Sequence, residues 1–516
     1  MREFPSLSPL LPEILALHGR WRPEKMAVIA ADTSKTWAGF VADNHRFAHG
    51  LRDAGIQPGD RVGIFMSNGY CMLTALFGVL ASGAVSVPLN TSVSDAAIVA
   101  MLGDAGIRAL IVSDEFRGRF ATVLPQLPPG ILCISDVESP DWHSLAALSA
   151  GQPQTLPPVV LSHDAPLNII YSSGTTGLPK GILHTHGGRR DWAYDLAIAL
   201  RYHSGARTLL TIGLYSNISW VAMLATLLAG GTLIVHPRFD AQAFLQTVET
   251  EAITHTAMVP IQFQRVLDAQ AGTPHDLSSM QAMMSCGSPL HEGLKRALFD
   301  AFPCGIIELY GLTEGIITTL DPEDAVGRWS SVGKPLLGTD LLIVGDDDKP
   351  CPQGEAGEIV SRGRITMPGY WQRDDANLAA RYVDPTGQIW LRSGDIGYLD
   401  DQGFLYIVDR KKDMILSGGQ NIYPQDIEAV LVAHPDIQDV AVIGASSKRW
   451  GETPIALIVM RDAATPVAPL LDWANQRLGK QQRLADCIAV ELLPRNPNGK
   501  ILKRELRQQY GDKTYA

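Results

Sequence analysis

One short segment of the chain combines hydroxylated residues, glycines and a single cation. Positions 171–181 read YSSGTTGLPKG. Hydroxyl groups and closely approaching glycine amides can donate hydrogen bonds to an anion, and a lysine adds a positive charge. This combination is typical of a phosphate-binding loop, although a plain surface loop can share the composition. The candidate phosphate ligands are Ser172, Ser173, Gly174, Thr175, Thr176, Gly177 and Lys180.

The spacing of this segment differs from that of the common nucleotide loop G-x-x-x-x-G-K-[ST]. Gly174 and Gly177 stand too close together, and Gly181 follows the lysine where that loop has Ser or Thr. Residues 167–171 read LNIIY, which is typical of a short buried strand. The loop is therefore expected to follow the end of a strand.

The composition bounds the size and the partners of the protein. Its 516 residues, 46% of them hydrophobic, are enough for two to four structural units at roughly 150 residues each. The net charge of −11 argues against general binding to nucleic acid or to an anionic membrane surface, so a phosphate ligand must be met by local cations. Six cysteines without a C-x-x-C pair, and an N-terminus without the apolar core of a secretory signal, predict a cytoplasmic protein.

Alternating strand-like and helical patterns surround the loop. They run over residues 37–235 and, in a second cycle, over 230–315, and they predict an α/β fold with parallel layers. Two uncharged stretches, 71–89 and 208–235, are interrupted by small or polar residues, which favours a core helix followed by a strand over a membrane span. Short apolar runs separated by Gly, Pro and Asp turns predict a β-rich subdomain over 333–363.

The last hundred residues are expected to form a separate α+β unit. A helix is predicted over 424–431, because apolar residues recur on one face and a proline stands near each end. The charged run DRKKD at 409–413 is the natural linker. We therefore predict a large N-terminal domain, 1–410, and a small C-terminal domain, 411–516.

Four further segments, taken together with the loop, carry a resemblance. They read SCGSPL at 285–290, ELYGLTEG at 308–315, LRSGDIGYLDDQGFLYIVDRKKDMILSGGQNIYP at 391–424 and PRNPNGKILKREL at 494–506. In this order and spacing the chain resembles, over nearly its whole length, the adenylate-forming (ANL) superfamily of acyl-CoA synthetases, luciferases and amino-acid adenylation domains. The GGQNIYP form is most similar to bacterial aryl- and medium-chain acyl-CoA ligases.

The resemblance implies a two-step reaction. A carboxylic acid is joined to the α-phosphate of ATP, giving an acyl-adenylate and pyrophosphate, and CoA then displaces AMP to give an acyl-CoA. Because the first step brings two anions together, cations and Mg²⁺ must offset their repulsion. The implied cofactors are ATP, Mg²⁺ and CoA as cosubstrate, and the implied enzyme class is an AMP-forming acid–thiol ligase.

The resemblance also assigns nucleotide-binding roles, residue by residue. Tyr310 would stack on adenine beside the backbone of Gly287 and Ser288. Asp395 would accept the two ribose hydroxyls, and Arg410 would bind the ribose and phosphate region. Taken alone, Tyr310 could equally be a core residue, and Asp395 a turn residue after Gly394.

Three further residues are assigned to catalysis together with Arg410. Thr313 would touch the α-phosphate, and Glu314 would be the ligand of Mg²⁺, which prefers carboxylate and phosphate oxygens. Lys500 would bridge the α-phosphate and the substrate carboxylate. The loop over 172–180 would wrap the β- and γ-phosphates, and so hold the leaving pyrophosphate.

The second half-reaction is assigned to a different segment. Lys412 falls where the family places its hinge, about which the small domain would rotate between the two steps. Ser417, Gly418 and Gly419 would line the CoA tunnel, where missing side chains leave room for a thin thiol chain. A solvated linker lysine and an ordinary turn are the alternative interpretations.

The acyl pocket is expected to be apolar and partly aromatic. Ser216 stands where many relatives carry a histidine, and Gly311 stands where acetate-specific relatives carry a tryptophan that blocks the channel. No acidic residue lies within 208–235, where amino-acid-activating relatives place an aspartate. An aryl, phenylpropenoyl or medium-chain acid is therefore the expected substrate. The predicted lining is Tyr215, Ser216, Asn217, Trp220, Cys286, Gly311 and Leu312.

Several alternatives stay open at this stage. The thiol acceptor is free CoA, or it is a carrier protein loaded by a stand-alone adenylation module. A homodimer is one option for the assembly. A catalytically silent protein with this fold is disfavoured, because the charged motif residues are all present. His184 and His186 are interpreted as structural residues rather than metal ligands.

Overall fold

A computed structural model describes residues 8–31, 33–172, 180–417, 420–462, 464–480, 482–496, 499–511 and 513–515, with Ser172 as backbone only. The predicted loop residues from Ser173 to Gly177, and the tunnel residues Gly418 and Gly419, lie outside these ranges. The chain forms two compact units. The first comprises Met1–Val326, Pro335–Asp340 and Arg362–Ala380, and the second comprises Gly327–Lys334, Leu341–Ser361 and Arg381–Ala516.

The first sheet of the first unit is mainly parallel. Its neighbouring strands follow the order β15-β14-β13-β12-β10-β11-β1-β2. The pairs from β14 to β1 are parallel, whereas β15 joins β14 and β2 joins β1 in the antiparallel sense. The strands are β1 (Met26–Ala30), β2 (Thr33–Thr36), β10 (Arg207–Leu210), β11 (Thr232–Val235), β12 (His255–Met258), β13 (Ala282–Ser285), β14 (Ile307–Leu312) and β15 (Ile316–Leu320).

The second sheet of this unit has the strand order β19-β9-β8-β4-β3-β5-β6-β7. Strands β8 to β7 along this order are parallel, and β9 runs antiparallel to both β8 and β19. The strands are β3 (Arg61–Phe65), β4 (Val85–Pro88), β5 (Ala109–Val112), β6 (Leu132–Ser135), β7 (His143–Ser144), β8 (Pro166–Ser172), β9 (Lys180–Thr185) and β19 (Gly369–Tyr370).

Helices cover both faces of these sheets, so successive strand residues face different cores. Leu210 and Ile111 belong to one large cluster that includes residues of both sheets and of the helices between them. Their neighbours Leu209 and Leu110 belong to two outer clusters. This two-sided burial explains why the strands read as nearly continuous apolar runs.

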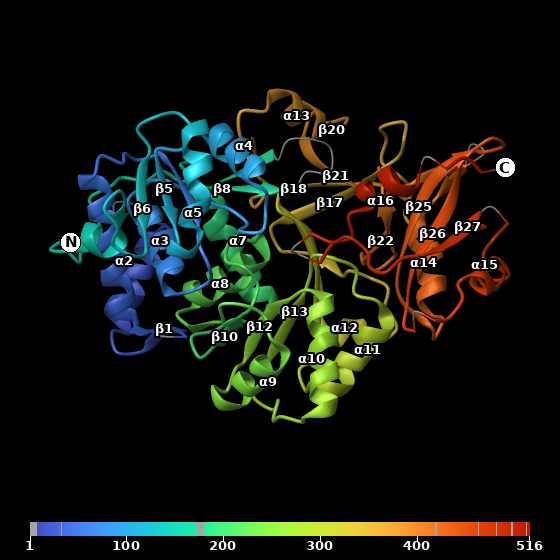
Figure 1. Ribbon diagram of the computed structural model, residues 1–516, viewed down its shortest axis with the longest axis horizontal. Helices are drawn as coiled ribbons and strands as arrows, with labels where there is room; N and C mark the ends of the chain where they lie inside the picture. The colour runs from blue at the N-terminus through green and yellow to red at the C-terminus, as the bar shows by residue number, and fades with distance from the viewer. Residues whose placement is uncertain are drawn as a thin grey trace. The chain divides into compact units, whose positions relative to one another are not determined.

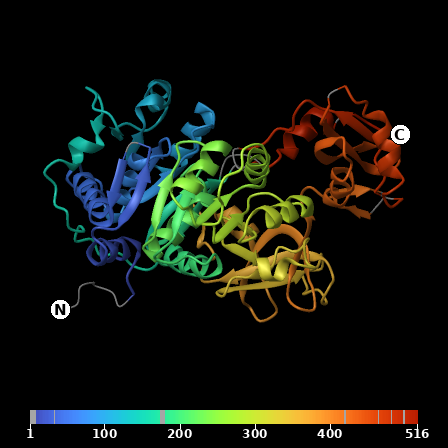
Figure 2. The ribbon, with the colours of Figure 1, turned by 90° about the horizontal axis from the view of Figure 1, so that it is seen from below.

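Each cluster has its own set of helices. Figure 1 shows the outer helices α9, α10 and α11 beside β12 and β13, and Figure 2 shows the helices near the N-terminus, in blue, against the strands of the second sheet. The helices of this unit are α1 (Leu11–Trp21), α2 (Trp37–Asp53), α3 (Tyr70–Ala81), α4 (Asp95–Ala105), α5 (Asp114–Val123), α6 (Leu145–Ser149), α7 (His186–Ala199), α8 (Asn217–Ala229), α9 (Ala241–Thr250), α10 (Pro260–Gly272), α11 (Glu292–Ala301), α12 (Pro322–Ala325) and α13 (Asp374–Ala379).

The second unit holds two smaller sheets. One follows the order β17-β18-β21-β20 with β22 beside β21, and the other follows β24-β23-β26-β25 with β27 beside β26. The elements are β17 (Thr339–Val344), β18 (Gly357–Gly363), β20 (Arg381–Val383), β21 (Ile389–Leu399), β22 (Leu405–Arg410), β23 (Ile415–Ser417), β24 (Gln420–Ile422), α14 (Pro424–Val432), β25 (Ile437–Ser447), β26 (Gly451–Met460), α15 (Ala468–Asn475), β27 (Asp486–Ala489) and α16 (Lys503–Tyr510).

The predicted α/β class and the main element predictions are confirmed. The stretch 71–89 forms α3 and β4, and the stretch 208–235 forms β10, α8 and β11. Within the described ranges, no helix is long and apolar enough to cross a membrane. The helix predicted over 424–431 is α14, which begins at Pro424 and ends one residue later than predicted, at Val432.

Gly315 is the last residue of the turn between β14 and β15, and its backbone conformation favours glycine. Its φ is +107°, and a Cβ atom there would collide with the carbonyl oxygen of Ile365 and lie 2.6 Å from the Cα of Thr366. We expect Gly315→Ala to lower the free energy of unfolding by about 2 kcal/mol or more, because backbone strain and overpacking add. Thermal melting measures the effect.

Gly327→Ala is the matched control for this change. Gly327 also has a positive φ, +84°, but a Cβ atom there would meet nothing within 4 Å. The melting temperature of Gly327→Ala should therefore fall less than that of Gly315→Ala, because only backbone strain acts at Gly327. Equal losses in the two variants would show that the collision at Gly315 has no energetic weight.

Candidate active site

The carboxyl ends of four parallel strands lie along one edge of the first sheet. The strands β10, β12, β13 and β14 are neighbours in this order. Gly287 and Ser288 follow β13, Tyr310 lies near the end of β14, and Thr313 and Glu314 follow β14 directly. Ligands of open α/β sheets bind outside this edge. The structure therefore brings five of the predicted nucleotide and catalytic residues to one edge.

Tyr370 links two of the predicted phosphate and metal residues. Its hydroxyl donates a hydrogen bond to Oε1 of Glu314 at 3.0 Å. The Nζ atom of Lys180 lies 4.9 Å from the centre of the same ring, within the range of a cation–π contact. Burial, together with the Glu314 charge, raises the pKa of Tyr370 above its usual value, so the phenol remains a donor. A cation and a carboxylate are thus held on one aromatic side chain.

The two-residue strand β19 places Tyr370. It pairs with β9, opposite Ile182, and the backbone N–H of Trp371 donates to the carbonyl of Gly181 at 2.7 Å. The side chain of Asn377 bonds both backbone groups of Tyr370, at 2.6 and 3.1 Å. Tyr370 is therefore fixed against the strand that begins at Lys180.

Asp104 of α4 contacts both β8, which precedes the predicted phosphate-binding segment, and the chain just after β19. Its carboxylate accepts the hydroxyl of Tyr171, the penultimate residue of β8, at 2.7 Å. It also pairs with Arg373, three residues after Tyr370, at 2.8 Å. The carboxylate of Asp104 thus holds both β8 and the part of the chain that carries Tyr370.

The turn at Thr313 is supported from β9. Nε2 of His184 lies 2.8 Å from the carbonyl oxygen of Thr313, and the backbone N–H of Met367 donates to the carbonyl of Glu314 at 2.8 Å. His184, which the sequence analysis interpreted as structural, therefore contacts the backbone of a predicted catalytic residue.

The predicted acyl residues on the loop after β10 are held by hydrogen bonds to three polar side chains. Asn68 accepts the N–H of Leu214 at 2.8 Å and donates to the carbonyl of Ile212 at 3.0 Å. The indole N–H of Trp220 donates to the carbonyl of Leu214 at 3.0 Å. Ser216 caps α8 by accepting the N–H of Ile218 at 3.3 Å.

The remaining acyl candidates differ in burial. Trp220 and Cys286 are buried members of the large core cluster, whereas Tyr215 and Leu312 are half-buried. Gly311 is exposed on one side, but a Cβ atom at this position would lie only 2.7 Å from the carbonyl oxygen of Ile316. The β14–β15 pairing therefore by itself favours glycine at position 311.

Four of the predicted charged residues, Asp395, Arg410, Lys412 and Lys500, lie in the second unit. Asp395 and Arg410 are opposite each other in β21 and β22, and Nε of Arg410 lies 2.6 Å from Oδ1 of Asp395. The hydroxyl of Ser393 accepts the backbone N–H of Asp395 at 2.9 Å. Lys500 lies in the field of this pair, because both charges act on its ammonium group.

Burial is the main cause that lowers the pKa of Lys500 to about 8, and the positive charge of Arg410 lowers it further while Asp395 opposes the shift. Burial lowers the pKa of Lys412, the charges of Asp413 and Asp395 oppose this shift, and the charge of Arg410 adds to it. Arg410, Lys412 and Lys500 thus interact with two carboxylates, and a group of three cations suits a polyanionic ligand. Ser417 ends β23 and is half-buried.

A single carboxylate, that of Glu314, is the predicted protein ligand of a magnesium ion. Within the described ranges, no three His, Cys, Asp or Glu side chains form a metal-binding cluster. Mg²⁺ is commonly bound by one or two carboxylates together with the phosphates of a nucleotide. Glu314, half-buried beside Lys180 and Tyr370, matches that donor set.

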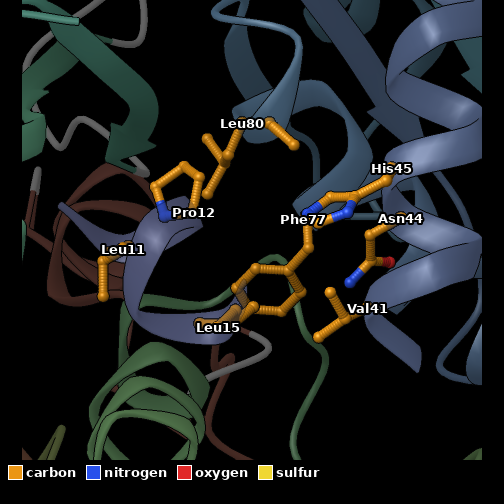
Figure 3. Close-up of a pocket in the computed structure, with 9 residues that line it drawn as sticks. Leu11, Pro12, Leu15, Val41, Asn44, His45, Phe77 and Leu80 are labelled. Carbon is orange, nitrogen blue, oxygen red and sulfur yellow. The ribbon is translucent and has the colours of Figure 1, made fainter. Parts of the chain in front are cut away.

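A small cavity lies away from all of these residues, between α1, α2 and α3 (Figure 3). Its volume of about 10 Å³ holds no more than one water. Asn44 points into it, and neither amide atom of this side chain has a hydrogen-bond partner among the residues described. The cavity is too small and too apolar for the nucleotide or the acid.

Sequence reasoning missed Tyr370, Asp104 and the role of His184. A two-residue strand leaves no periodic signal, and the only hint at Tyr370 was an aromatic residue after Pro368 and Gly369. Asp104 is an acidic residue near the end of α4, with nothing in the local sequence to mark it. Their contacts span long separations in the chain, which motif spacing does not reveal.

Comparisons with known proteins agree with this arrangement. Residues 16–371 match the family model described as AMP-binding enzyme, and residues 426–500 match the AMP-binding enzyme C-terminal domain. A feruloyl-CoA synthase of an Amycolatopsis species is 34% identical over 95% of this chain and 97% of its own. A long-chain-fatty-acid–CoA ligase of Mycobacterium tuberculosis is 32% identical over 93% of this chain and 94% of its own.

A solved structure shares the fold over almost the whole chain. It is an anthranilate CoA ligase in complex with anthranoyl-AMP, with a TM-score of 0.89, 25% identity and 98% of each chain covered. The predicted resemblance to the adenylate-forming superfamily is confirmed: the chain belongs to the AMP-binding enzyme family.

Proposed function

We propose that the protein joins an apolar carboxylic acid to AMP, with ATP as donor, and then transfers the acyl group to the thiol of CoA. One observation carries the proposal. Tyr370 holds Lys180 and Glu314 on a single side chain at the end of the phosphate-binding segment. A cation and a carboxylate at that place suit a pyrophosphate leaving group that departs with a divalent metal ion.

In the first half-reaction, an oxygen of the substrate carboxylate bonds to the α-phosphorus of ATP. The bond from that phosphorus to the bridging oxygen breaks, and pyrophosphate leaves with its electrons. We assign Lys180 to the pyrophosphate and Thr313 to the α-phosphate, and Lys500 offsets the charge shared by carboxylate and phosphate. Magnesium bound with ATP would neutralise phosphate charge, and Glu314 would be its protein ligand.

The nucleoside part of ATP is assigned to two further sets of residues. Tyr310 would stack on adenine next to Gly287 and Ser288, which share its sheet edge. Asp395 would accept the ribose hydroxyls, and its ion pair with Arg410 holds the carboxylate in place.

In the second half-reaction, the thiolate of CoA attacks the carbonyl carbon of the acyl-adenylate. The carbon–oxygen bond to AMP breaks, AMP leaves, and the thiol proton has passed to solvent. We assign the thiol channel to Ser417, Gly418 and Gly419, and the hinge between the half-reactions to Lys412.

The acid is proposed to be aryl, phenylpropenoyl or aliphatic. The half-buried side chains of Tyr215 and Leu312 and the small Gly311 offer an apolar, uncharged surface. The similar proteins named above act on ferulate, long-chain fatty acids and anthranilate, which are all largely apolar acids. AMP release measured over benzoate, ferulate, octanoate and decanoate, with ATP and CoA, tests the proposal; no AMP above background with any acid would overturn it.

A second candidate function differs only in the acceptor. A stand-alone adenylation module would load the acyl group onto the phosphopantetheine thiol of a carrier protein. Thioester formation with free CoA separates the two, because a carrier-specific enzyme makes the adenylate but gives no acyl-CoA. Acyl-AMP that accumulates in the presence of CoA would favour the carrier.

Gly311→Trp should shift the preference from large acids toward acetate or propionate by on the order of tenfold or more, because an indole fills volume that the larger acyl group needs. The measurement is kcat/KM for decanoate and for acetate. Gly311→Ala is the control, since its Cβ atom meets the same carbonyl of Ile316 without filling the pocket. If Gly311→Trp and Gly311→Ala had the same selectivity, the assignment of Gly311 to the acyl pocket would be wrong.

Glu314→Gln should slow acyl-adenylate formation by on the order of 100-fold, because the amide is a poor ligand for magnesium. Pyrophosphate exchange at varied magnesium concentration measures it. Glu323→Gln is the control, because Glu323 is exposed and paired with Arg201. If Glu314→Gln reached wild-type rates at ordinary magnesium, the metal role of Glu314 would be wrong.

Lys500→Ala should slow adenylation by on the order of 100-fold or more and still convert supplied acyl-adenylate and CoA into thioester, because its charge is needed only in the first step. The two half-reactions are assayed separately. Lys513→Ala, at an exposed lysine paired with Asp486, is the control. Equal loss of both half-reactions would contradict a role in one step.

The pH dependence of adenylation offers an independent test of Lys500. Because burial lowers the pKa of Lys500 to about 8, the free enzyme loses this cation as the pH rises through that value. We expect kcat/KM for adenylation to fall above pH 8. In Lys500→Arg the fall should move to higher pH, because a guanidinium stays protonated. An unchanged profile in Lys500→Arg would assign the titration to another group.

A further inference from the structure

Arg189 is a buried cation whose recorded partners are neutral. It lies on α7, and its side chain is 1% exposed. Nη2 lies 2.7 Å from Oδ1 of Asn217 and 3.2 Å from Nδ1 of His184, and Nε lies 3.3 Å from Oδ1 of Asn168. Two tryptophan rings flank the guanidinium, with ring centres at 4.5 and 5.4 Å.

This arrangement is costly for a residue that only fills space. Burial lowers the pKa of Arg189 to about 9, which shows how far the charge is removed from water. None of its recorded partners in the described part of the chain is a carboxylate that would offset the desolvation. A long apolar side chain would fill the same volume at lower cost. The hydrogen bonds of Arg189, rather than its volume, therefore distinguish it from an apolar side chain at this position.

The bond to His184 fixes which ring nitrogen carries the proton. A guanidinium can only donate, so Nδ1 of His184 must accept. Nε2 then carries the hydrogen and donates to the carbonyl oxygen of Thr313 at 2.8 Å. Burial and the Arg189 charge lower the pKa of His184 well below its usual value, so the ring stays neutral with this single tautomer.

The bond to Asn217 leads to the acyl side of the site. Asn217 is the first residue of α8, directly after Tyr215 and Ser216. Trp220, one of the two rings against the guanidinium, lies one turn further along the same helix. The same Nη2 atom of Arg189 therefore contacts the start of α8 and the imidazole that supports the Thr313 turn.

We propose that Arg189 is a positioning residue that couples the acyl-side start of α8 to the Thr313–Glu314 turn through His184. The inference rests on the proposed function, in which α8 borders the acid and the turn contacts the α-phosphate. An acid that fixes the position of the first turn of α8 then also fixes the position of the Thr313 carbonyl. Because the turn at Thr313 is already in place, ATP binds more tightly. By thermodynamic reciprocity, ATP tightens the binding of the acid by the same factor.

The experiment measures this factor directly. Titration calorimetry gives the Kd of α,β-methylene-ATP, whose phosphorus–carbon bond cannot release pyrophosphate, without and with a saturating acid. The acid is whichever of benzoate, ferulate, octanoate and decanoate gives the fastest AMP release. We expect the acid to lower the Kd at least about fivefold in the wild type. In Arg189→Met the ratio should fall to about one.

Two substitutions at His184 break the relay at different links. His184→Gln keeps an amide donor near the position of Nε2 but loses the acceptor for Arg189. His184→Asn keeps an acceptor near Nδ1 but loses the donor to Thr313. Both should reduce the ratio toward one, and Arg189→Lys should restore only part of it, because an ammonium lacks the two-sided fork of a guanidinium.

Arg190→Met is the matched control. Arg190 is the next residue on α7 and is also buried, but it bonds Ser8 and Asp191 instead. Its loss should lower the melting temperature and leave the Kd ratio at the wild-type value. If Arg189→Met does not fold, the two His184 variants carry the test.

The outcomes separate this inference from the proposed function. A wild-type ratio near one, or a wild-type ratio retained in folded Arg189→Met and His184→Asn, would overturn the coupling and leave Arg189 as a stabilising residue. Failure of the wild type to release AMP with any acid of the panel would instead overturn the proposed function. In that case the coupling is still measured as the Kd ratio of the nucleotide, with the acid of the panel that changes this Kd most.

Discussion

A polar group in the core between two sheets has no water to bond, so it must find its partner on another element. This constraint shapes the edge where the predicted residues meet. The indole N–H of Trp220 reaches back to the carbonyl of Leu214, and the hydroxyl of Ser219 reaches the carbonyls of Ile212 and Gly213. The path of the loop between β10 and α8 is therefore fixed by hydrogen bonds from side chains in the first turn of α8.

The same constraint marks what the sequence could and could not predict. Strands such as β10 and β11, buried on both faces, and helix α8 between them follow from continuous apolar runs broken at Gly230 and Gly231. Glu314 and Lys180 could be named as candidates because their motifs are local. Tyr370 was not found, because it meets Glu314 across 56 residues through a strand of two residues.

The two buried histidines show the limit of local patterns in another way. His184 and His186 look alike in the sequence, yet His184 has bonds on both ring nitrogens. Both ring nitrogens of His186 are buried, and neither has a recorded hydrogen bond within the described ranges. The difference is set by Arg189, which lies on the helix after β9. Only the packed structure distinguishes the two rings.

Burial acts in opposite directions on the pKa of a phenol and on the pKa of an amine. It raises the pKa of Tyr370 and so secures its proton, but it lowers the pKa of Lys500 and so weakens its charge. A phenol can therefore be sealed off from water without losing its function as a donor. An amine in the same situation depends on an approaching anion to retain its proton.

The path of the chain between the two units has a consequence for how the protein can be divided. The first unit is discontinuous, because Pro335–Asp340 and Arg362–Ala380 return to it after residues that belong to the second unit. The last of these returning segments carries Tyr370. A gene fragment that ends at Val326 would thus encode Lys180 and Glu314 without the side chain that holds both. Exchanging the rest of the chain with that of a relative by a single crossover at that point would pair Lys180 and Glu314 of one protein with the tyrosine segment of another.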